Sequence, residues 1–250
     1  MKIQGNLLKM STEIHGKVQY SLKLGGQELN MNDLISKELK IEYLNEINCI
    51  KCGRKTKTSF AQGFCYPCFI SSSETEECVL RPELCQAHNG IARDMDYAKK
   101  HCLNDHIVYL ALTSGVKVGV TRITQIPTRW IDQGAWKAIK LAVTPNRYLA
   151  GSIEVALKQH LNDKTNWRHM LTNKLAEEIN LVEQKNKAID LLHTDFQEYA
   201  SDDDNILELQ YPVMKYPEKV KSINFDKIPF VHDVLTGIKG QYLIFDSGEV

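Results

Sequence analysis

The chain has 250 residues, and its 31 Lys and Arg balance its 31 Asp and Glu, so overall charge singles out no nucleic-acid or membrane partner. This length suffices for one large domain or two to three small ones. The first twenty residues lack the apolar core of a signal peptide, and no apolar run reaches membrane-spanning length, so we expect a cytoplasmic protein. In a reducing compartment, its seven cysteines favour metal ligands and buried thiols over disulfides.

The first segment, residues 1–48, reads as strands joined by turns. Residues 17–24 alternate polar and apolar side chains and then meet Gly25-Gly26, a turn signal. Residues 39–44 form a further candidate strand, which leads into a cysteine-rich segment.

That segment, residues 49–105, begins with two Cys-x-x-Cys pairs: Cys49 with Cys52, and Cys65 with Cys68. A tetrahedral zinc ion needs four soft ligands, and two such pairs supply them from one short stretch. The pairs lie among polar turns and not at a strand-to-helix junction, which disfavours a thioredoxin-type redox pair or two disulfides. Four cysteines leave no coordination position for water or substrate, so we predict a structural zinc ribbon.

Three more cysteines follow with irregular spacing. A second closed zinc site would combine Cys78, Cys85 and Cys102 with an imidazole, for which we assign His106. The alternative is buried thiols beside surface histidines, since free cysteine packs as a small apolar side chain. The sequence leaves both interpretations open.

The middle segment, residues 106–174, opens with candidate strands at 107–112 and 116–121 joined by a short connection. Alternation sorts their side chains onto two faces. One face is apolar, and the other carries Tyr109, Lys117, Gly119 and Thr121. The ordinary interpretation is a half-buried hairpin with a polar outer face. The alternative is a site at which Gly119 lets a backbone or a phosphate approach closely.

Helical periodicity appears twice after the hairpin. Residues 151–162 place apolar side chains on one face, with Ser152 as the expected N-cap. The next segment, 175–204, predicts a long polar helix over 175–199 and a solvated acidic loop, Asp202-Asp203-Asp204.

The last segment, residues 205–250, is again strand-like. Its candidate strands are 206–211 and 241–245. Because neither chain end alone offers enough strands for a stable sheet, we expect it to pair with residues 1–48 in one small β domain that flanks the middle of the chain.

Charge is unevenly distributed along the chain. Residues 113–174 hold ten Lys and Arg against three Asp and Glu, whereas residues 175–204 hold two against nine. The zinc stretch adds Lys51, Arg54, Lys55 and Lys57. Clustered Lys and Arg are what phosphate neutralisation requires, which favours a polyanion-binding face over ordinary solvated surface. The acidic helix is a candidate surface for a protein partner.

The hairpin resembles a known family. Val108-Tyr109-Leu110, followed by Lys117-Val118-Gly119-Val120-Thr121, looks like the paired signature of GIY-YIG endonucleases. Those nucleases place an Arg shortly after the second strand and a Glu on a following helix, positions that Arg129 and Glu154 match. The resemblance covers residues 107–166 and implies a small α/β core.

The resemblance also implies roles. Glu154 would hold Mg²⁺ or Mn²⁺, which polarises the scissile phosphate, and Tyr109 would position or deprotonate the attacking water. Arg129, or Arg122 in its place, would stabilise charge in the transition state. Asn166 would occupy the late polar position of the family.

The chain departs from the family at two positions. Lys117 replaces the second tyrosine; it can bind phosphate, but it acts as a base near neutral pH only if its pKa is lowered. Gln133 lies near the place of the usual His or Tyr. Glu154 also has a structural interpretation, since Lys158 follows four residues later in the orientation of a helix-surface ion pair.

A second resemblance runs over most of the chain. The zinc loop, together with residues 128–135 and 165–168, is similar to a bacterial zinc-ribbon family of uncharacterised function. This resemblance implies no activity.

The sequence thus predicts an α+β protein with a zinc ribbon, a GIY-YIG-like core and a β domain built from both chain ends.

The predicted function is nucleic-acid binding, to DNA or RNA, with metal-dependent phosphodiester cleavage by the core. The alternative is a non-catalytic, zinc-stabilised module that binds nucleic acid or a protein. The predicted nucleic-acid-binding side chains are Lys117, Arg122, Arg129, Trp130 and Arg168. The arginines could instead cover tryptophans at the edge of the core.

Overall fold

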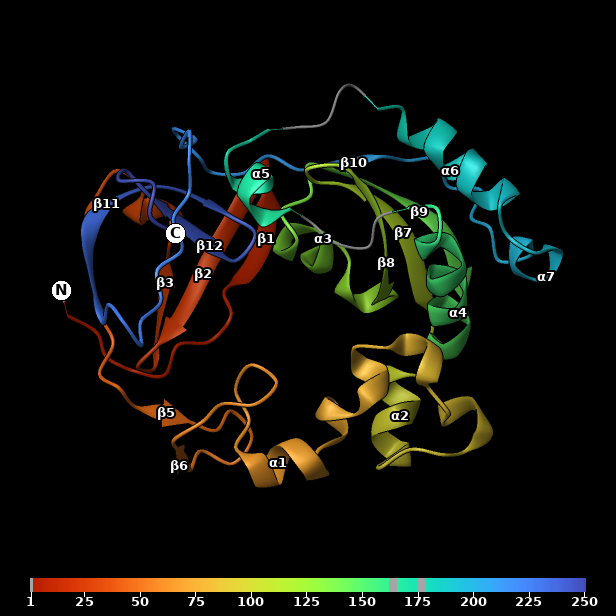
Figure 1. Cartoon of the computed structure of the whole chain (residues 1–250), viewed down its shortest axis with the longest axis horizontal. Helices are drawn as coiled ribbons and strands as arrows, with labels where there is room; N and C mark the ends of the chain where they lie inside the picture. Colours follow the sequence, from red (N-terminus) through yellow and green to blue (C-terminus); the bar gives the residue numbers. More distant parts are fainter. Residues whose placement is uncertain (1, 162–165, 175–178) are drawn as a thin grey trace.

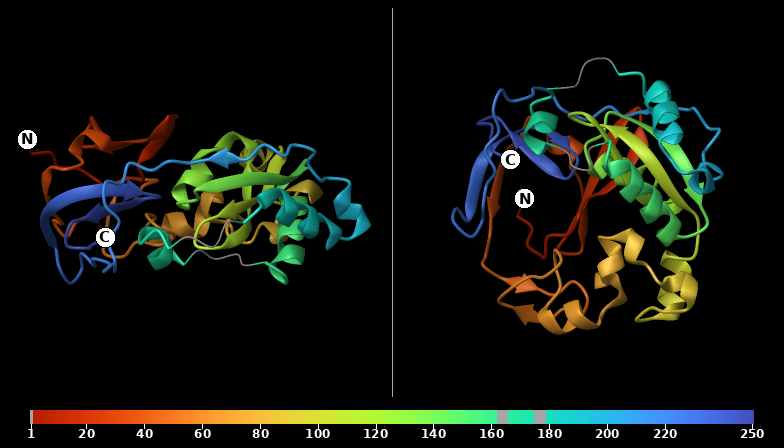
Figure 2. Two further views of the ribbon diagram at one scale, coloured as in Figure 1. Left: turned by 90° about the horizontal axis from the view of Figure 1, so that it is seen from above. Right: turned by 45° about the vertical axis from the view of Figure 1, so that its right-hand side comes forward.

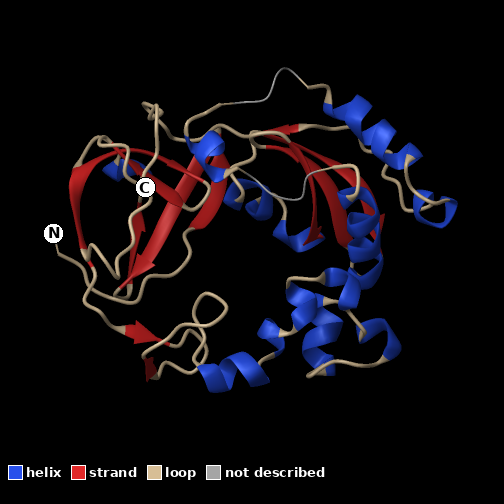
Figure 3. Cartoon of the chain, viewed as in Figure 1, coloured by secondary structure: helices blue, strands red, loops and turns tan. Residues whose placement is uncertain are grey.

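The computed structural model describes residues 2–161, 166–174 and 179–250. The fold is a mixed α+β arrangement of several small sheets and helices (Figures 1 and 3). Sheets from the chain ends lie on one side of the molecule, and a central sheet with its helices lies on the other. The cysteine-rich segment runs along the lower edge in Figure 1 and links the two sides, as the rotated views of Figure 2 also show.

The N-terminal residues form an antiparallel sheet in the order β1-β2-β3. β1 spans Ser11–His15, β2 spans Lys17–Leu24 and β3 spans Gln27–Asn30. The strand predicted at 17–24 is confirmed. The turn after it needs positive φ, and Gly25 and Gly26 supply φ values of 59° and 76°.

The two chain ends pair in a second sheet, in the order β12-β11-β4. β4 (Glu38–Glu42) is antiparallel to β11 (Phe230–Lys239), and β11 is antiparallel to β12 (Tyr242–Phe245). The expected pairing of the chain ends is therefore confirmed. The strand predicted at 206–211 is wrong in length and place, because β10 spans only Leu207–Glu208 and pairs with the central sheet.

The central sheet is antiparallel, in the order β10-β9-β7-β8. β7 spans His106–Leu112, β8 spans Val116–Arg122 and β9 spans Lys137–Thr144. The predicted hairpin is confirmed, and Tyr109 faces Gly119 in its register. Every residue of β7 is buried, so the interpretation of a polar outer face is wrong.

Both faces of the central sheet are covered. On one face, Val108 and alternate residues of β7 pack in an apolar cluster with the helices α4 (Arg147–Lys158) and α6 (Leu181–Asp190). On the other face, Ile107 and Tyr109 join a core shared with the terminal sheets. Leu209 and Tyr211, which follow β10, also pack into this core, and the Leu209 N–H still donates to the Trp136 carbonyl at 2.8 Å. The core thus unites residues of the first, middle and last segments.

α4 covers Arg147–Lys158 and begins before the helix predicted at position 151. Its N-cap is Asn146, whose side chain accepts a hydrogen bond from the Leu149 N–H. Ser152, the predicted N-cap, lies inside the helix, and its hydroxyl donates to the Tyr148 carbonyl at 3.0 Å. Asparagine caps a helix as well as serine does. Asn146 comes before Ser152 in the chain, so α4 begins directly after Asn146.

The long helix predicted over 175–199 is wrong. Residues 175–178 lie outside the described part of the chain, α6 covers only Leu181–Asp190, and α7 is a single turn at Thr194–Gln197. The apolar stripe of α6 packs on the central sheet, so only its polar sides remain at the surface. The acidic residues after α7 form a loop, as predicted.

Two short helices flank the central sheet: α3 (Thr128–Asp132) follows β8, and α5 (Trp167–Leu171) follows α4. In the described part of the chain, no helix combines the length and the apolar character that crossing a bilayer requires.

The cysteine-rich segment contains little regular structure. β5 (Ile47–Asn48) and β6 (Lys55–Thr56) form a two-residue ladder, and α1 spans Tyr66–Ser71. Single-turn 3-10 helices lead from there to α2 (Met95–His101). Because the β5–β6 ladder contains only two residue pairs, backbone pairing by itself does little to stabilise this segment.

Candidate metal centres and the buried tyrosine site

Four cysteines converge at the short ladder. Cys49 and Cys52 lie on the turn between β5 and β6, and Cys65 and Cys68 lie at the start of α1. The four sulfur atoms lie within 4.8 Å of one another, and those of Cys52 and Cys65 are 3.8 Å apart. Zn–S bonds of about 2.3 Å in a tetrahedron place sulfurs about 3.8 Å apart. The predicted ligands are brought together, and the cluster fits a zinc-binding site.

The local backbone supports the thiolate form that a metal requires. Burial opposes ionisation of Cys49, but hydrogen bonds from the backbone of Cys65 and Cys52 outweigh it and lower the pKa of this thiol to about 6. A backbone hydrogen bond from Arg54 lowers the pKa of Cys52. Burial, followed by hydrogen bonds with the adjacent cysteines, raises the pKa of Cys68 to about 12. A bound cation would favour the thiolate of this residue.

A second cluster joins three other cysteines. Cys78, Cys85 and Cys102 are buried, and their sulfur atoms lie within 4.8 Å of one another. The prediction of His106 as a fourth ligand is not met, because neither of its ring nitrogens belongs to this group. The first position of β7 holds His106, and its Nδ1 lies 2.7 Å from the Asn104 carbonyl oxygen.

His106 is held as a neutral imidazole. A carbonyl only accepts hydrogen bonds, so Nδ1 carries the ring proton. Nε2 is buried, and within the described residues it has no hydrogen-bond partner. Burial, and then the charges of Arg147 and Arg122, lower the pKa of His106 to about 4 despite the hydrogen bond to Asn104.

Tyr109 lies at the centre of the site that the resemblance to GIY-YIG endonucleases predicts. Its side chain is fully buried, and its hydroxyl accepts a hydrogen bond from Nε2 of Gln133 at 2.7 Å. The ring packs edge-on against Trp130, with centroids 5.8 Å apart. Burial raises the pKa of Tyr109; the charge of Glu154 acts in the same direction, while Arg129 and the hydrogen bond oppose it. Arg129 and Glu154 are therefore within electrostatic reach of the hydroxyl.

Gly119 makes room for this tyrosine. A Cβ at position 119 would lie 2.6 Å from the Tyr109 hydroxyl oxygen. The alternative interpretation, in which Gly119 admits a backbone or a phosphate, does not hold in this structure, because the Tyr109 side chain occupies the space.

Two of the other predicted catalytic residues, Glu154 and Lys117, are also covered. Glu154 is 9% exposed and forms the expected ion pair with Lys158, 3.3 Å away, and Lys117 is 8% exposed. A phosphate reaches these groups and Tyr109 only if the covering elements move. Asn166 has a structural role: it is the N-cap of α5, and its side chain accepts a hydrogen bond from the His169 N–H.

The predicted nucleic-acid-binding residues differ in exposure. Arg129 and Arg168 are exposed, and Arg122 is half-buried and hydrogen-bonded to a histidine. Trp130 is 3% exposed, so its assignment as a stacking platform is wrong; the ring belongs to the core. Arg168 lies over the Trp167 ring at 4.3 Å, which is the alternative arrangement of an arginine covering a tryptophan.

The sequence interpretation missed Arg147. From the first position of α4, its Nη1 lies 3.4 Å from the Cys78 carbonyl oxygen and 3.8 Å from the Cys78 sulfur, and its Nη2 donates to the His101 carbonyl at 3.1 Å. A cation in the first turn opposes the helix dipole, so an arginine there signals a partner outside the helix. That signal was available once the helix start was known.

Comparison with known proteins gives one finding. Residues 36–250 match a family described as "Protein of unknown function (DUF2797)". This agrees with the resemblance to a family of uncharacterised function. No curated protein and no solved structure matches the chain.

Proposed function

The chain belongs to the DUF2797 family, and we propose that it binds nucleic acid through its zinc region. A structural zinc ion held by Cys49, Cys52, Cys65 and Cys68 would fix the ladder β5–β6 and the start of α1. Rigid loops present charged side chains to a ligand without a large ordering cost.

Charge supports this proposal. Lys51, Arg54, Lys55 and Lys57 are all exposed, with no acidic residue between Cys49 and Thr58. Lys51 and Lys55 pair with exposed glutamates, and such surface pairs contribute at most about 1 kcal/mol, so phosphates can replace them. This exposed basic loop, bounded by the four converging cysteines, is the observation that carries the proposal.

Aromatic side chains lie beside the same cluster. Tyr66, next to Cys65, is 57% exposed, and its ring lies 5.5 Å from that of Phe60. Phe60 in turn stacks on Phe69. An exposed ring supported by other rings, next to basic side chains, suits the stacking of an unpaired base. Single-stranded nucleic acid is therefore the favoured ligand.

The test is binding of labelled single-stranded and duplex oligonucleotides, followed by fluorescence anisotropy over a salt series. The double variant Lys55→Glu, Lys57→Glu changes charge at positions that do not adjoin a cysteine. The matched control, Lys219→Glu with Lys227→Glu, makes the same change at exposed positions of the C-terminal segment.

We expect the logarithm of the wild-type binding constant to fall linearly with the logarithm of salt, by roughly 0.7 for each phosphate contact on a single strand. The Lys55, Lys57 variant should bind more weakly with a shallower slope, and the control should match wild type. Absent or salt-insensitive binding, or equal losses in both variants, would reject the proposal and favour a protein-binding module.

Phosphodiester cleavage by the GIY-YIG-like core is the second candidate. It is supported by the chain order of β7, β8, α3, β9 and α4, which puts Arg129 after the second strand and Glu154 on the later helix. Gln133 adds support, because its Oε1 is buried without a hydrogen-bond partner within the described residues, beside the Tyr109 hydroxyl. An unsatisfied polar atom there suits a water or a ligand.

The cleavage test is incubation of the wild type with DNA and RNA in Mg²⁺ or Mn²⁺. Glu154→Gln should abolish cleavage by removing the carboxylate that would hold the metal. Lys158→Gln is the control, since it removes the ion pair and keeps the carboxylate. Cleavage is excluded as an activity if wild type leaves both substrates intact, or if Glu154→Gln cuts as fast as wild type.

A further inference from the structure

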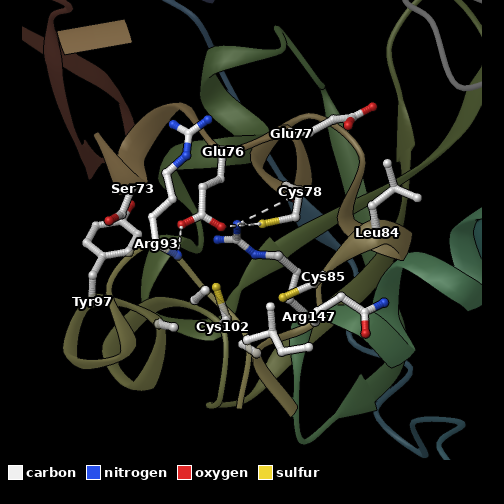
Figure 4. A pocket seen from close by; sticks show the side chains of 15 residues that line it. Ser73, Glu76, Glu77, Cys78, Leu84, Cys85, Arg93, Tyr97, Cys102 and Arg147 are labelled. Carbon is white, nitrogen blue, oxygen red and sulfur yellow. Dashed lines mark hydrogen bonds between the residues drawn. The ribbon is translucent and has the colours of Figure 1, made fainter. Parts of the chain in front are cut away.

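Cys78, Cys85 and Cys102 come from three separate turns of the cysteine-rich segment. Cys78 lies in a 3-10 turn, Cys85 follows the next such turn, and Cys102 ends α2. Their exposed fractions are 8%, 2% and 4%. Figure 4 shows the three sulfur atoms gathered around the end of the Arg147 side chain.

The spacing of these sulfurs suits one metal ion. All three lie within 4.8 Å of one another, close to the separation of about 3.8 Å that a tetrahedral zinc imposes. In a [4Fe–4S] cluster each cysteine binds a different iron atom, and in a [2Fe–2S] cluster at most two cysteines share one iron, so three cysteine sulfurs on either cluster would not all stand at this short separation. A disulfide would use two of the sulfurs and leave the third without a role.

Charge also suits a metal. Three thiolates on a divalent cation carry a net charge of −1. The Arg147 guanidinium, 3.8 Å from the Cys78 sulfur, balances that charge. Its bonds to the carbonyls of Cys78 and His101 tie two of the cysteine-bearing turns together. Such outer-shell contacts orient the ligands of metal sites.

The three cysteines border a pocket, into which the fourth coordination position of a bound metal would open. Among the described residues, no histidine, aspartate or glutamate has a ligand atom within 4.8 Å of all three sulfurs. Glu76 also lines the pocket, and its Oε2 lies 4.0 Å from the Cys78 sulfur without joining the group. All three cysteines line a pocket of about 320 Å³, together with Arg147 and the apolar side chains of Ala87 and Ala98. Water occupies about 30 Å³ in the liquid, so this volume admits a ligand of several heavy atoms.

We propose that Cys78, Cys85 and Cys102 form a second, mononuclear zinc centre whose fourth position is open to the pocket and takes an exchangeable small thiol. Zinc sites with three protein ligands keep an open position, unlike closed structural sites. A centre with three thiolates is soft and prefers a further sulfur donor. The two clusters of this chain therefore differ in kind: one is closed, and the other exchanges its ligand.

The experiment uses the full-length protein. Elemental analysis should give two zinc ions per chain for wild type and one for either Cys102→Ser or Cys68→Ser. In protein loaded with Co²⁺ instead of zinc, titration with 2-mercaptoethanol should shift the visible absorption bands until one thiol per chain is bound. The shift should persist in Cys68→Ser and vanish in Cys102→Ser.

Arg147→Gln provides a second variant that retains all three sulfurs. It should lower the affinity of this centre for metal by roughly ten- to a hundredfold and leave the four-cysteine centre unchanged. One metal ion per wild-type chain would overturn the proposal. So would two ions with a cobalt spectrum that the thiol does not alter, because a protein side chain would then fill the fourth position.

Discussion

The ring of Tyr109 lies across Gly119 on the neighbouring strand. A Cβ at position 119 would come within 2.6 Å of the tyrosine oxygen and 2.7 Å of its Cζ atom. The two residues face each other in the register of β7 and β8, and the oxygen is held by Gln133. The glycine is therefore required by the packing of a buried aromatic ring in the core.

Gly119→Ala should destabilise the fold, because the new methyl group overlaps a fully buried ring. Overpacking of this kind costs about 1–3 kcal/mol in the free energy of unfolding. Urea denaturation measures it. Gly115→Ala in the hairpin connection is the control, since nothing lies within 4 Å of its Cβ. Equal stability of the two variants would show that the ring does not fill this space.

Asn146→Ala should destabilise the protein by about 1 kcal/mol, because it removes the side-chain acceptor for the Leu149 N–H at the start of α4. Ser152→Ala should change stability by less than about 0.5 kcal/mol, since alanine is a better helix former inside the helix. Thermal unfolding of the two variants compares the observed cap with the predicted one. The reverse order of effects would place the helix start at Ser152.

Cys52→Ser should release one zinc ion and open the basic loop to trypsin at Lys51, Arg54, Lys55 and Lys57. Zinc binding supplies about 10 kcal/mol or more to small zinc domains, so cleavage should accelerate by roughly tenfold or more. Cys102→Ser changes the other cluster and should leave this loop resistant. If trypsin cuts wild type and Cys52→Ser at the same rate, metal does not hold the loop.

Acid should weaken the fold through His106. Its pKa is about 4 in the folded protein, chiefly because of burial, with Arg147 and Arg122 acting in the same direction and Asp105 and Asn104 opposing them. The unfolded value is about 6.5, so between these values the unfolded chain binds more protons. The contribution is fully present above about pH 6.5, and roughly 2 kcal/mol is lost between about pH 7 and pH 5.

The variant His106→Asn tests this effect, since asparagine keeps an N–H group near the position of Nδ1 but does not titrate. Between about pH 7 and pH 5, the free energy of unfolding of this variant should fall by roughly 2 kcal/mol less than that of wild type. His160→Asn, at an exposed position, should follow the wild-type curve. Parallel curves for wild type and His106→Asn would rule out His106 as the titrating group.

The sequence correctly predicted those features that depend on near neighbours. Two Cys-x-x-Cys pairs separated by one short loop reach a common point whatever surrounds them, which is why Cys49, Cys52, Cys65 and Cys68 converge. The alternation at 107–112 and 116–121 likewise specifies a hairpin and its two faces. The helix at 175–199 failed because its periodicity continued through residues that tertiary packing places in two separate elements.

By itself, then, the amino-acid sequence determined one four-cysteine cluster and the central hairpin, because ligand spacing and side-chain alternation act over a few residues. The pairing of the chain ends was expected only because neither end alone offers enough strands for a stable sheet, and the tertiary structure decided its partners and register. Only the tertiary structure decided that the second face of the hairpin is buried, that Gly119 accommodates Tyr109, and that His106 stands outside the second cysteine cluster. It also brought Arg147 to Cys78. These relationships depend on which distant surfaces pack together, and that outcome reflects the whole core and not the spacing of any motif.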